Sequence, residues 1–388
     1  MTKPVLALTT FVSLGTLGFN FAFVGAALPE MLAEFGIRIS RGSLIPATVQ
    51  VAYALLCFLG GIVADFVNKR RILIVGCIVI GLGAGVVGLP SGFWANLLLF
   101  GVIGVGAGTV FISSNLLVIE LFPENPGSYL NIHHLTFALC SFIAPILMSR
   151  AITSGVGWQT AFRGLAILSA VLALVLLLNR FPMPKPGPPA GVNPWKSRIV
   201  AIKNKNSAFV IFLTFLAIGT QFTIMFLLVT YLVDAKSFSV PGASAVLSGF
   251  YILLAGGRLI CSVLVRRYSN RLILLVLLAL LAAFILVGIV GDPGIAGIAL
   301  ALTGLAASGL YPSILAMASE VTQVTSRGIV LGSLAMAGGF GGMAVTQVTA
   351  GVSEQIGIST AFWVVLGVVA FTFFYLLVLG RGIRPVER

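Results

Sequence analysis

Residues 271–290 read RLILLVLLALLAAFILVGIV, in which one arginine is followed by nineteen residues without a polar side chain. An apolar run of about 20 residues is long enough to cross the hydrocarbon core of a bilayer as a helix. Because lipid offers the backbone no hydrogen-bond partners, a run of this kind has to be helical. This segment therefore predicts a transmembrane helix.

The rest of the chain has the same apolar character. Of its 388 residues, 59% are hydrophobic and only 9% are charged, and the mean hydropathy is +1.13. Soluble domains carry about 25% charged residues, so a soluble fold of this length would lack the polar residues for its surface. The composition indicates an integral membrane protein.

Short polar or Gly/Pro-containing breakers divide the sequence into apolar runs, among them Asn68–Arg71, Pro123–Pro126, Gly155–Gly157 and Gly291–Pro293. They predict twelve transmembrane helices. The expected spans are residues 5–29, 43–65, 72–89, 93–119, 129–150, 158–180, 208–232, 243–265, 271–290, 294–320, 327–352 and 358–380.

The two halves of the sequence repeat at an offset of 200 residues. Arg71 matches Arg271, and Gly104–Glu120 matches Gly304–Glu320. Because each repeat contains six spans, an even number, the halves share one orientation, as in a parallel repeat about an axis along the membrane normal. Transporters move such repeats against each other around a site near the midplane.

We therefore expect an all-α membrane protein with two six-helix bundles. The first covers residues 1–181 and the second residues 208–388. The Pro- and Lys-rich segment 182–207 is the expected cytoplasmic linker between them.

The basic residues give the expected orientation. The net charge of +13 does not indicate a nucleic-acid partner, because the basic residues lie mainly between apolar runs. With the N-terminus inside, seventeen Lys and Arg residues fall in cytoplasmic segments and five on the other side. Cytoplasmic loops are enriched in Lys and Arg. We expect a multi-pass protein of the cell membrane, the plasma membrane of a bacterium or an archaeon, with both termini in the cytoplasm.

The loop after the second span carries a recognisable pattern. Residues 61–70 read GIVADFVNKR and resemble the G-x-x-x-D-R/K-x-G-R/K-R/K loop of the major facilitator superfamily, with Phe66 and Asn68 as departures. The resemblance covers the whole chain and implies the major facilitator fold. It also implies that Asp65 caps helix N-termini and pairs with basic residues to hold the outward-open state. The expected gating residues are Asp65, Lys69, Arg70, Glu120 and Glu320. The alternative is that these charges only set the topology.

Other motifs narrow the choice within the family. Phe100 stands where proton-driven drug exporters often carry an arginine. Leu130–Phe137, followed by Pro145, resembles the fifth span of fucose-permease-like sugar transporters, as do Ala255–Leu259 and Gly309–Ser313 in later spans. This resemblance favours solute uptake over drug export.

Polar side chains inside the expected spans mark a candidate site, because polar groups in lipid usually face a cavity or another helix. Amide and phenol groups suit a hydroxyl-rich solute. The alternative for each residue alone is an interhelical hydrogen bond. The expected substrate-binding residues are Asn20, Gln50, Tyr53, Asn115, His134, Gln221, Tyr251, Arg258, Tyr311 and Gln347.

Arg258 is the only basic residue deep in an expected span, about two turns from Arg266. An arginine at this depth needs compensation. Three partners stay open: an anionic group of the substrate, groups of span five near Asn131 and His134, or headgroups reached by snorkelling.

The sequence thus predicts a secondary transporter that moves a small polar organic solute, sugars included, by alternating access. The alternatives are an exporter of drugs or amphipathic compounds, an organic-anion carrier using Arg258, and a transporter-like sensor. A proton or sodium ion is the expected coupling ion, and the alternative is an uncoupled facilitator or a differently coupled carrier. His134 is the candidate proton carrier, and no Asp or Glu lies in the middle of an expected span. We expect a monomer. The sequence contains no nucleophile–base pair, metal cluster or dinucleotide-binding loop, so we expect neither enzymatic activity nor a metal or other cofactor.

Overall fold

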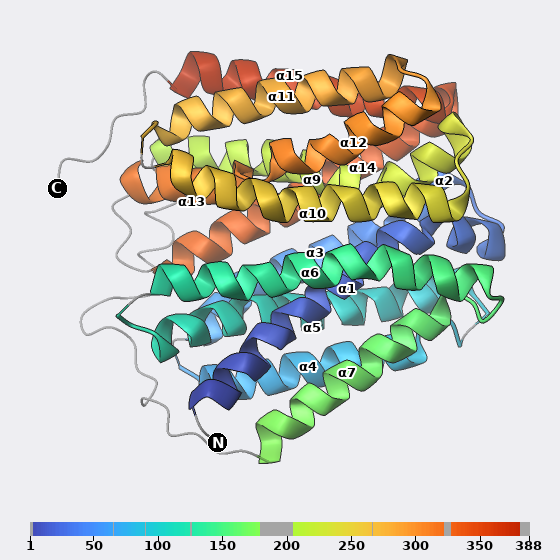
Figure 1. The fold of residues 1–388 in the computed structure, drawn as a ribbon. Coiled ribbons are helices and arrows are strands. Elements are labelled where there is room, and N and C mark those ends of the chain that lie inside the picture. The colour runs from blue at the N-terminus through green and yellow to red at the C-terminus, as the bar shows by residue number, and fades with distance from the viewer. Residues whose placement is uncertain are drawn as a thin grey trace.

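The computed structural model describes residues 3–64, 66–89, 91–124, 126–178, 205–265, 267–321 and 327–380. Within these ranges every regular element is a helix (Figure 1). The N-terminal half contains α1 (Lys3–Phe35), α2 (Ile39–Gly42), α3 (Leu44–Val63), α4 (Lys69–Val86), α5 (Phe93–Leu121), α6 (Pro126–Thr153) and α7 (Gln159–Leu178). The C-terminal half contains α9 (Lys205–Lys236), α10 (Val240–Leu264), α11 (Asn270–Val290), α12 (Pro293–Ala307), α13 (Leu310–Val321), α14 (Arg327–Ile356), η1 (Ile358–Thr360) and α15 (Ala361–Leu379).

Ten helical segments of the described ranges are long and apolar enough to cross a membrane, with α2–α3 and α12–α13 each taken as one segment. The two further long helices are α4, which begins with three basic residues, and the glycine-rich α14. Together they make the twelve crossings and the two six-helix halves that the sequence predicts. The predicted linker, residues 182–207, lies largely outside the described residues, which resume at Lys205.

Two predicted boundaries are wrong. The first span does not end at Pro29, because α1 continues through that proline to Phe35. The tenth span is not continuous, because Ser308 and Gly309 separate α12 from α13. Pro312 explains the break: it has no N–H to donate to the carbonyl of Ser308, as a continuous helix would require.

The two halves also repeat in structure. Arg70 donates from Nη2 to the carbonyl of Leu176 at the end of α7. Arg271 donates from Nη2 to the carbonyl of Leu377, near the end of α15, at 2.9 Å. Arg271 is therefore equivalent to Arg70, and the pairing with Arg71 predicted from the sequence is off by one residue. The segment from Arg70 to Gly104 is one residue longer than the equivalent segment from Arg271 to Gly304.

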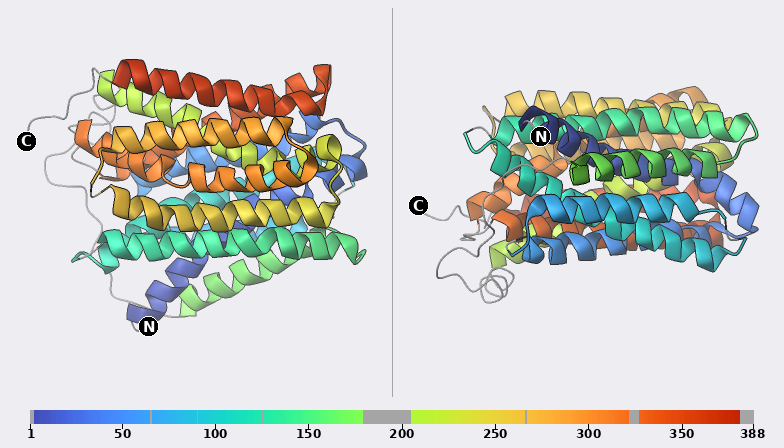
Figure 2. Two further views of the ribbon diagram at one scale, coloured as in Figure 1. Left: turned by 45° about the horizontal axis from the view of Figure 1, so that its top comes forward. Right: turned by 90° about the horizontal axis from the view of Figure 1, so that it is seen from below.

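The three largest contacts between the halves pack α1 against α9, α3 against α14, and α6 against α10. The left view of Figure 2 shows α6 and α10 side by side between the two halves. A two-fold relation between the halves makes α3 equivalent to α10 and α6 equivalent to α14. The α3–α14 and α6–α10 contacts are therefore equivalent, as expected for a parallel repeat.

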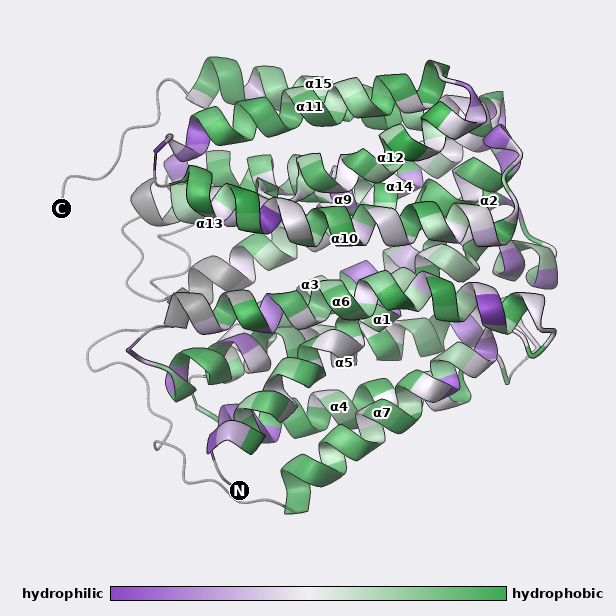
Figure 3. Ribbon diagram, viewed as in Figure 1, coloured by the Kyte–Doolittle hydropathy of each residue, from purple (hydrophilic) through white to green (hydrophobic). Residues whose placement is uncertain are grey.

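Hydropathy follows the expected membrane geometry. In Figure 3 hydrophobic residues cover the lengths of the outer helices, and hydrophilic residues gather at the two ends of the bundle. We call the end that carries Lys3 and Leu379 the terminal face, and the end that carries Phe35 and Lys236 the opposite face. Large apolar residues of α4 and α11 are exposed, such as Leu82 at 63% and Val290 at 68%, which suits contact with lipid.

Candidate functional site

Most of the predicted substrate-binding residues share one property: each has at least one buried polar side-chain atom for which no hydrogen-bond partner lies in the part of the chain that the structure describes. Buried polar groups in folded proteins are nearly always paired, because an unpaired one costs about 1–3 kcal/mol. A set of such groups therefore calls for a partner from outside the chain, water or a ligand. The six predicted residues with this property are Asn20, Gln50, Tyr251, Arg258, Tyr311 and Gln347.

These six residues come from both halves. Asn20 and Gln50 belong to α1 and α3, and the other four to α10, α13 and α14. Of these helices, α1, α3, α10 and α14 pack across the contact between the halves, and Tyr311 of α13 lies close to Tyr53 and Cys57 of α3. The unpaired groups thus lie on helices along which the two halves meet.

Asn20 and Gln50 are the most completely unpaired side chains of the set. Both are fully buried, and both atoms of each amide lack a partner among the described residues. Gln50 lies where α14 approaches α3 most closely. A methyl group added at Gly342 would touch the Gln50 amide, and one added at Gly339 would touch the Gln50 backbone. The glycines of α14 therefore bring the two halves together around this amide.

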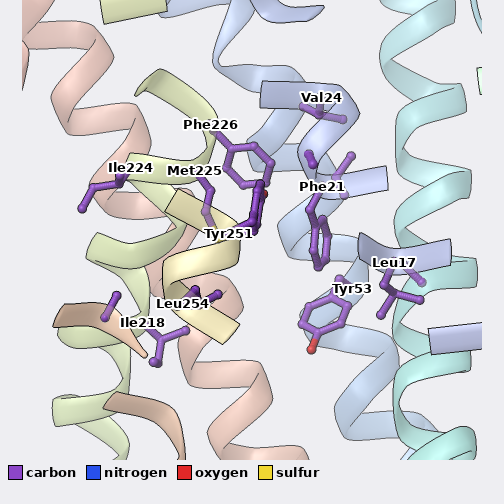
Figure 4. Close-up of a cluster of buried hydrophobic side chains, with 14 of the residues drawn as sticks. Leu17, Phe21, Val24, Tyr53, Ile218, Ile224, Met225, Phe226, Tyr251 and Leu254 are labelled. Atoms are coloured by element: carbon purple, nitrogen blue, oxygen red, sulfur yellow. The ribbon is translucent and has the colours of Figure 1, made fainter. Parts of the chain in front are cut away.

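Aromatic rings pack beside these polar groups. Tyr53 and Tyr251 belong to the predicted set, whereas Phe21, Phe222 and Phe226 were not predicted from the sequence. Phe21 makes edge contacts with Tyr53 and Phe222, with ring centroids 5.6 Å apart in each case, and with Phe226 at 6.2 Å. In Figure 4 Phe21 and Tyr53 lie on one side of the contact between the halves, and Phe226 and Tyr251 on the other. The combination of apolar rings with a few polar groups is typical of small-molecule sites.

Asn115 and His134 are paired with each other. The Nε2 atom of His134 lies 3.1 Å from Oδ1 of Asn115, and Nδ2 of Asn115 donates to the carbonyl of Phe111 at 2.7 Å. For these two residues the structure gives the interhelical hydrogen bond that was the alternative to substrate binding. Gln221 makes only a long contact, 3.9 Å from Nε2 to the Met225 sulfur.

The sequence analysis missed His133. This fully buried residue places Nε2 3.1 Å from Oγ of Ser114. The bond runs parallel to the one between His134 and Asn115, so that two consecutive residues of α6 bind two consecutive residues of α5. The pairs Ser114-Asn115 and His133-His134 in neighbouring spans were the available signal.

Arg258 lies where α10 packs against α6. It is close enough to His134 for an electrostatic interaction, in accord with the predicted proximity of spans five and eight. Its Nε and Nη1 atoms are buried without a partner among the described residues. The side chain of Asn131, the other predicted neighbour, is outside the described part.

Three of the five predicted gating residues, Lys69, Arg70 and Glu120, lie at the terminal face. The ammonium group of Lys69 lies 2.6 Å from the carboxylate of Glu120, and Arg70 binds the end of α7. Asn68, which replaces the usual glycine of the family loop, accepts a hydrogen bond from the Arg70 backbone N–H and so caps α4. Asp65 and the side chain of Glu320 are outside the described residues.

The opposite face is held together by contacts between the halves. Arg38 forms a 3.2 Å ion pair with Glu354 of α14. Deeper in the bundle, Gly25 of α1 lies against the backbone of Met225 on α9 so closely that a Cβ would overlap its carbonyl. The structure is therefore closed at the opposite face. No metal-type cluster of His, Cys, Asp or Glu occurs among the residues that the structure describes.

Comparison with known proteins identifies the family. The sequence profile of the Major Facilitator Superfamily matches residues 10–294 and 210–388. The chain belongs to the Major Facilitator Superfamily. Among curated members, the hexuronate transporter of Bacillus subtilis (strain 168) is 25% identical over 247 residues, 60% of this chain and 58% of that protein. Mouse sodium-dependent glucose transporter 1A is 27% identical over 147 residues, 37% of this chain and 33% of its own length.

Solved structures of the superfamily share the fold over nearly the whole chain. The nucleoside transporter NupG superposes with a TM-score of 0.79 at 17% identity, covering 98% of this chain and 100% of NupG. A variant of the E. coli fucose:proton symporter FucP gives 0.65 at 19% identity, covering 95% and 97%. The resemblance to the fucose-permease group is thus confirmed at the level of the fold.

Proposed function

We propose that this protein is a secondary transporter that carries a small, hydroxyl-rich organic solute across the membrane by alternating access. The observation that carries the proposal is the set of buried amide and phenol groups without partners, contributed by both halves where they meet. A solute held between two halves that move as bodies is exposed first at one face and then at the other. Each unpaired amide or phenol can donate and accept a hydrogen bond, as a sugar or similar solute requires.

The named activities of several relatives support the same class of solute. The curated relatives are described as transporters of hexuronate and glucose, and the structural neighbours as transporters of nucleosides and fucose. These are small, polar and hydroxylated compounds. No comparable observation favours an exporter of amphipathic drugs.

The proposal includes the topology and the energy source. Both termini face the cytoplasm of a bacterial or archaeal cell, since basic residues predominate in the loops on that side. The protein works as a monomer, and a proton or sodium gradient drives the solute. Asp65 acts as the gate residue, and Lys69, Arg70 and Glu120 fix the loop and helix ends next to it.

Ligand screening of the purified full-length protein tests the solute class. A ligand at 100 times its Kd stabilises the folded state by about 2.7 kcal/mol, which raises the midpoint of thermal unfolding. We expect hexoses, hexuronates or nucleosides to raise the midpoint, and cationic amphipathic drugs to leave it unchanged.

Uptake of the stabilising solute into proteoliposomes then tests transport and coupling. We expect uptake to depend on an imposed proton or sodium gradient. Stabilisation by drugs alone, or binding without gradient-driven or exchange transport, would overturn the proposal.

A further inference from the structure

Arg258 carries a positive charge that nothing in the described structure neutralises. Its Nε and Nη1 atoms are buried and make no hydrogen bond to a described residue. An uncompensated buried cation is costly, so a compensating group is expected from outside the chain.

The acidic residues in the described part of the chain lie elsewhere. The described ion pairs are Arg38–Glu354 and Lys69–Glu120, both at the ends of the bundle. The remaining described carboxylates lie at helix ends or in loops: Glu30, Glu34, Glu124, Asp234 and Asp292. His134, the titratable neighbour, supplies no negative charge, and its Nε2 atom faces Asn115.

Glu320 is the nearest acid along α13 by sequence, and its backbone position places it far from Arg258. Gly257 packs directly against Ser308, which sets the level of Arg258 beside the break between α12 and α13. Glu320 follows Ser308 by twelve residues. At 1.5 Å per residue this is roughly 18 Å along a helix, beyond the reach of a direct ion pair.

Two phenol hydroxyl groups without partners lie on the helices next to Arg258 or on its own helix. Tyr251 precedes Arg258 by seven residues on α10 and so lies on the same side of that helix, two turns away. Tyr311 follows Ser308 by three residues and lies close to Tyr53 and Cys57 of α3. The hydroxyl groups of Tyr251 and Tyr311 are both buried and unpaired among the described residues.

We propose that Arg258 binds a carboxylate of the transported solute, so that the substrate is a small polyhydroxylated acid. This inference rests on the proposed function and specifies its substrate class. The guanidinium presents parallel N–H donors that match the two oxygens of a carboxylate. The nearby phenols and the amides of Asn20, Gln50 and Gln347 bind the hydroxyl groups. Because Arg258 supplies a single charge at this level, a monoanion fits better than a doubly charged phosphate ester.

Matched acid and neutral probes test the inference with the full-length protein. The pairs are gluconate with sorbitol and glucuronate with glucose, and Kd is obtained from the dependence of the unfolding midpoint on probe concentration. In the wild-type protein we expect each acid to bind at least about tenfold more tightly than its neutral partner, the gain of one charge-assisted hydrogen bond.

The variants separate the charge from stability. Arg258→Gln should reduce the acid preference below about twofold. Arg258→Lys keeps the charge and loses the paired donors, so an intermediate preference is expected. The matched control is Arg271→Gln, since Arg271 binds only the end of α15. It should lower the unfolding midpoint and keep the acid preference.

Each outcome decides the inference. Equal binding of acid and neutral probes by the wild-type protein, or an acid preference that persists in Arg258→Gln, overturns the carboxylate site and leaves the proposed function standing. Binding of no polar solute at all overturns both. If Arg258→Gln does not fold, the inference is still tested by the acid preference of the wild-type protein and by its reduction in Arg258→Lys.

Discussion

Lys69 in the first turn of α4 and Glu120 near the end of α5 form a 2.6 Å ion pair that lies entirely within the N-terminal half. The other ion pair of the described residues, Arg38–Glu354 at 3.2 Å, joins the loop before α2 to α14 and therefore bridges the halves. If the halves move as bodies during transport, the bridging pair breaks in each cycle and the internal pair does not. Substitutions in one ion pair can therefore serve as the control for substitutions in the other.

Glu120→Gln should lower stability without changing the balance of conformations. The Lys69 and Glu120 side chains are 17% and 26% exposed, so we expect a loss near the upper end of the range for exposed pairs, about 1 kcal/mol. The double charge swap Lys69→Glu with Glu120→Lys should recover most of it. Thermal unfolding measures the loss, and cysteine labelling at both faces measures the conformational balance. A change in labelling would instead give the pair the gating role that the family resemblance implies.

Glu354→Gln should favour opening of the opposite face. An exposed pair contributes about 0.2–1 kcal/mol, and Arg38 is 82% exposed, so the populations should shift by at most about fivefold. Labelling of cysteines at the opposite face should rise. Salt at 1 M should have the same effect on the wild-type protein, because it screens charges beyond about 3 Å. Unchanged labelling under both conditions would mean that the pair does not hold this face closed.

Two glycines distinguish a contact between halves from a contact within one half. A Cβ at Gly25 would overlap the carbonyl of Met225 in the other half, and a Cβ at Gly341 would overlap the carbonyl of Phe215 in its own half. Both obstacles are backbone atoms, so no rotamer change removes them. Gly25→Ala can be relieved by opening the opposite face, whereas Gly341→Ala cannot.

We therefore expect Gly25→Ala to increase labelling at the opposite face with little change in the unfolding midpoint. Gly341→Ala should lower the midpoint, as overpacking costs about 1–3 kcal/mol, and leave labelling unchanged. Equal effects of the two substitutions on both measurements would show that the α1–α9 contact does not open.

The sequence was sufficient for features that depend on local chemistry. Hydropathy alone predicts the twelve spans, because lipid forces long apolar runs into helices. The predicted polar set includes six residues with unpaired buried atoms, since a polar side chain in an apolar run must face either a neighbour or a ligand. The left-handed glycines Gly155 and Gly157, with φ of +79° each, were likewise visible as a breaker.

Features that depend on distant parts of the chain were not predictable. Arg38 and Glu354 are 316 residues apart, and no local pattern pairs them. The close approach of Gly25 to Met225 depends on how the halves pack. The break at Ser308 depends on the missing N–H of Pro312, whereas the hydropathy of residues 294–320 alone predicts one continuous span.

The unpaired amides of Asn20 and Gln50 give the most direct test of the site. An unpaired buried polar group costs about 1–3 kcal/mol, and replacing it by an apolar group of similar shape is neutral or stabilising. Asn20→Leu and Gln50→Met should therefore leave the ligand-free protein as stable as before or more stable. Both should weaken uptake of the solute found by screening, because its hydroxyl groups lose their partners.

The control for this prediction is Asn115→Leu. Asn115 is also buried, but its amide binds both His134 and the carbonyl of Phe111. Its removal leaves those groups unpaired and should lower stability by about 1–3 kcal/mol. If Asn20→Leu raises the midpoint of thermal unfolding and loses uptake, whereas Asn115→Leu lowers the midpoint, then Asn20 binds the solute and Asn115 stabilises the fold. If Asn20→Leu and Gln50→Met destabilise the protein as much as Asn115→Leu and retain normal uptake affinity, these amides serve the fold and not the solute.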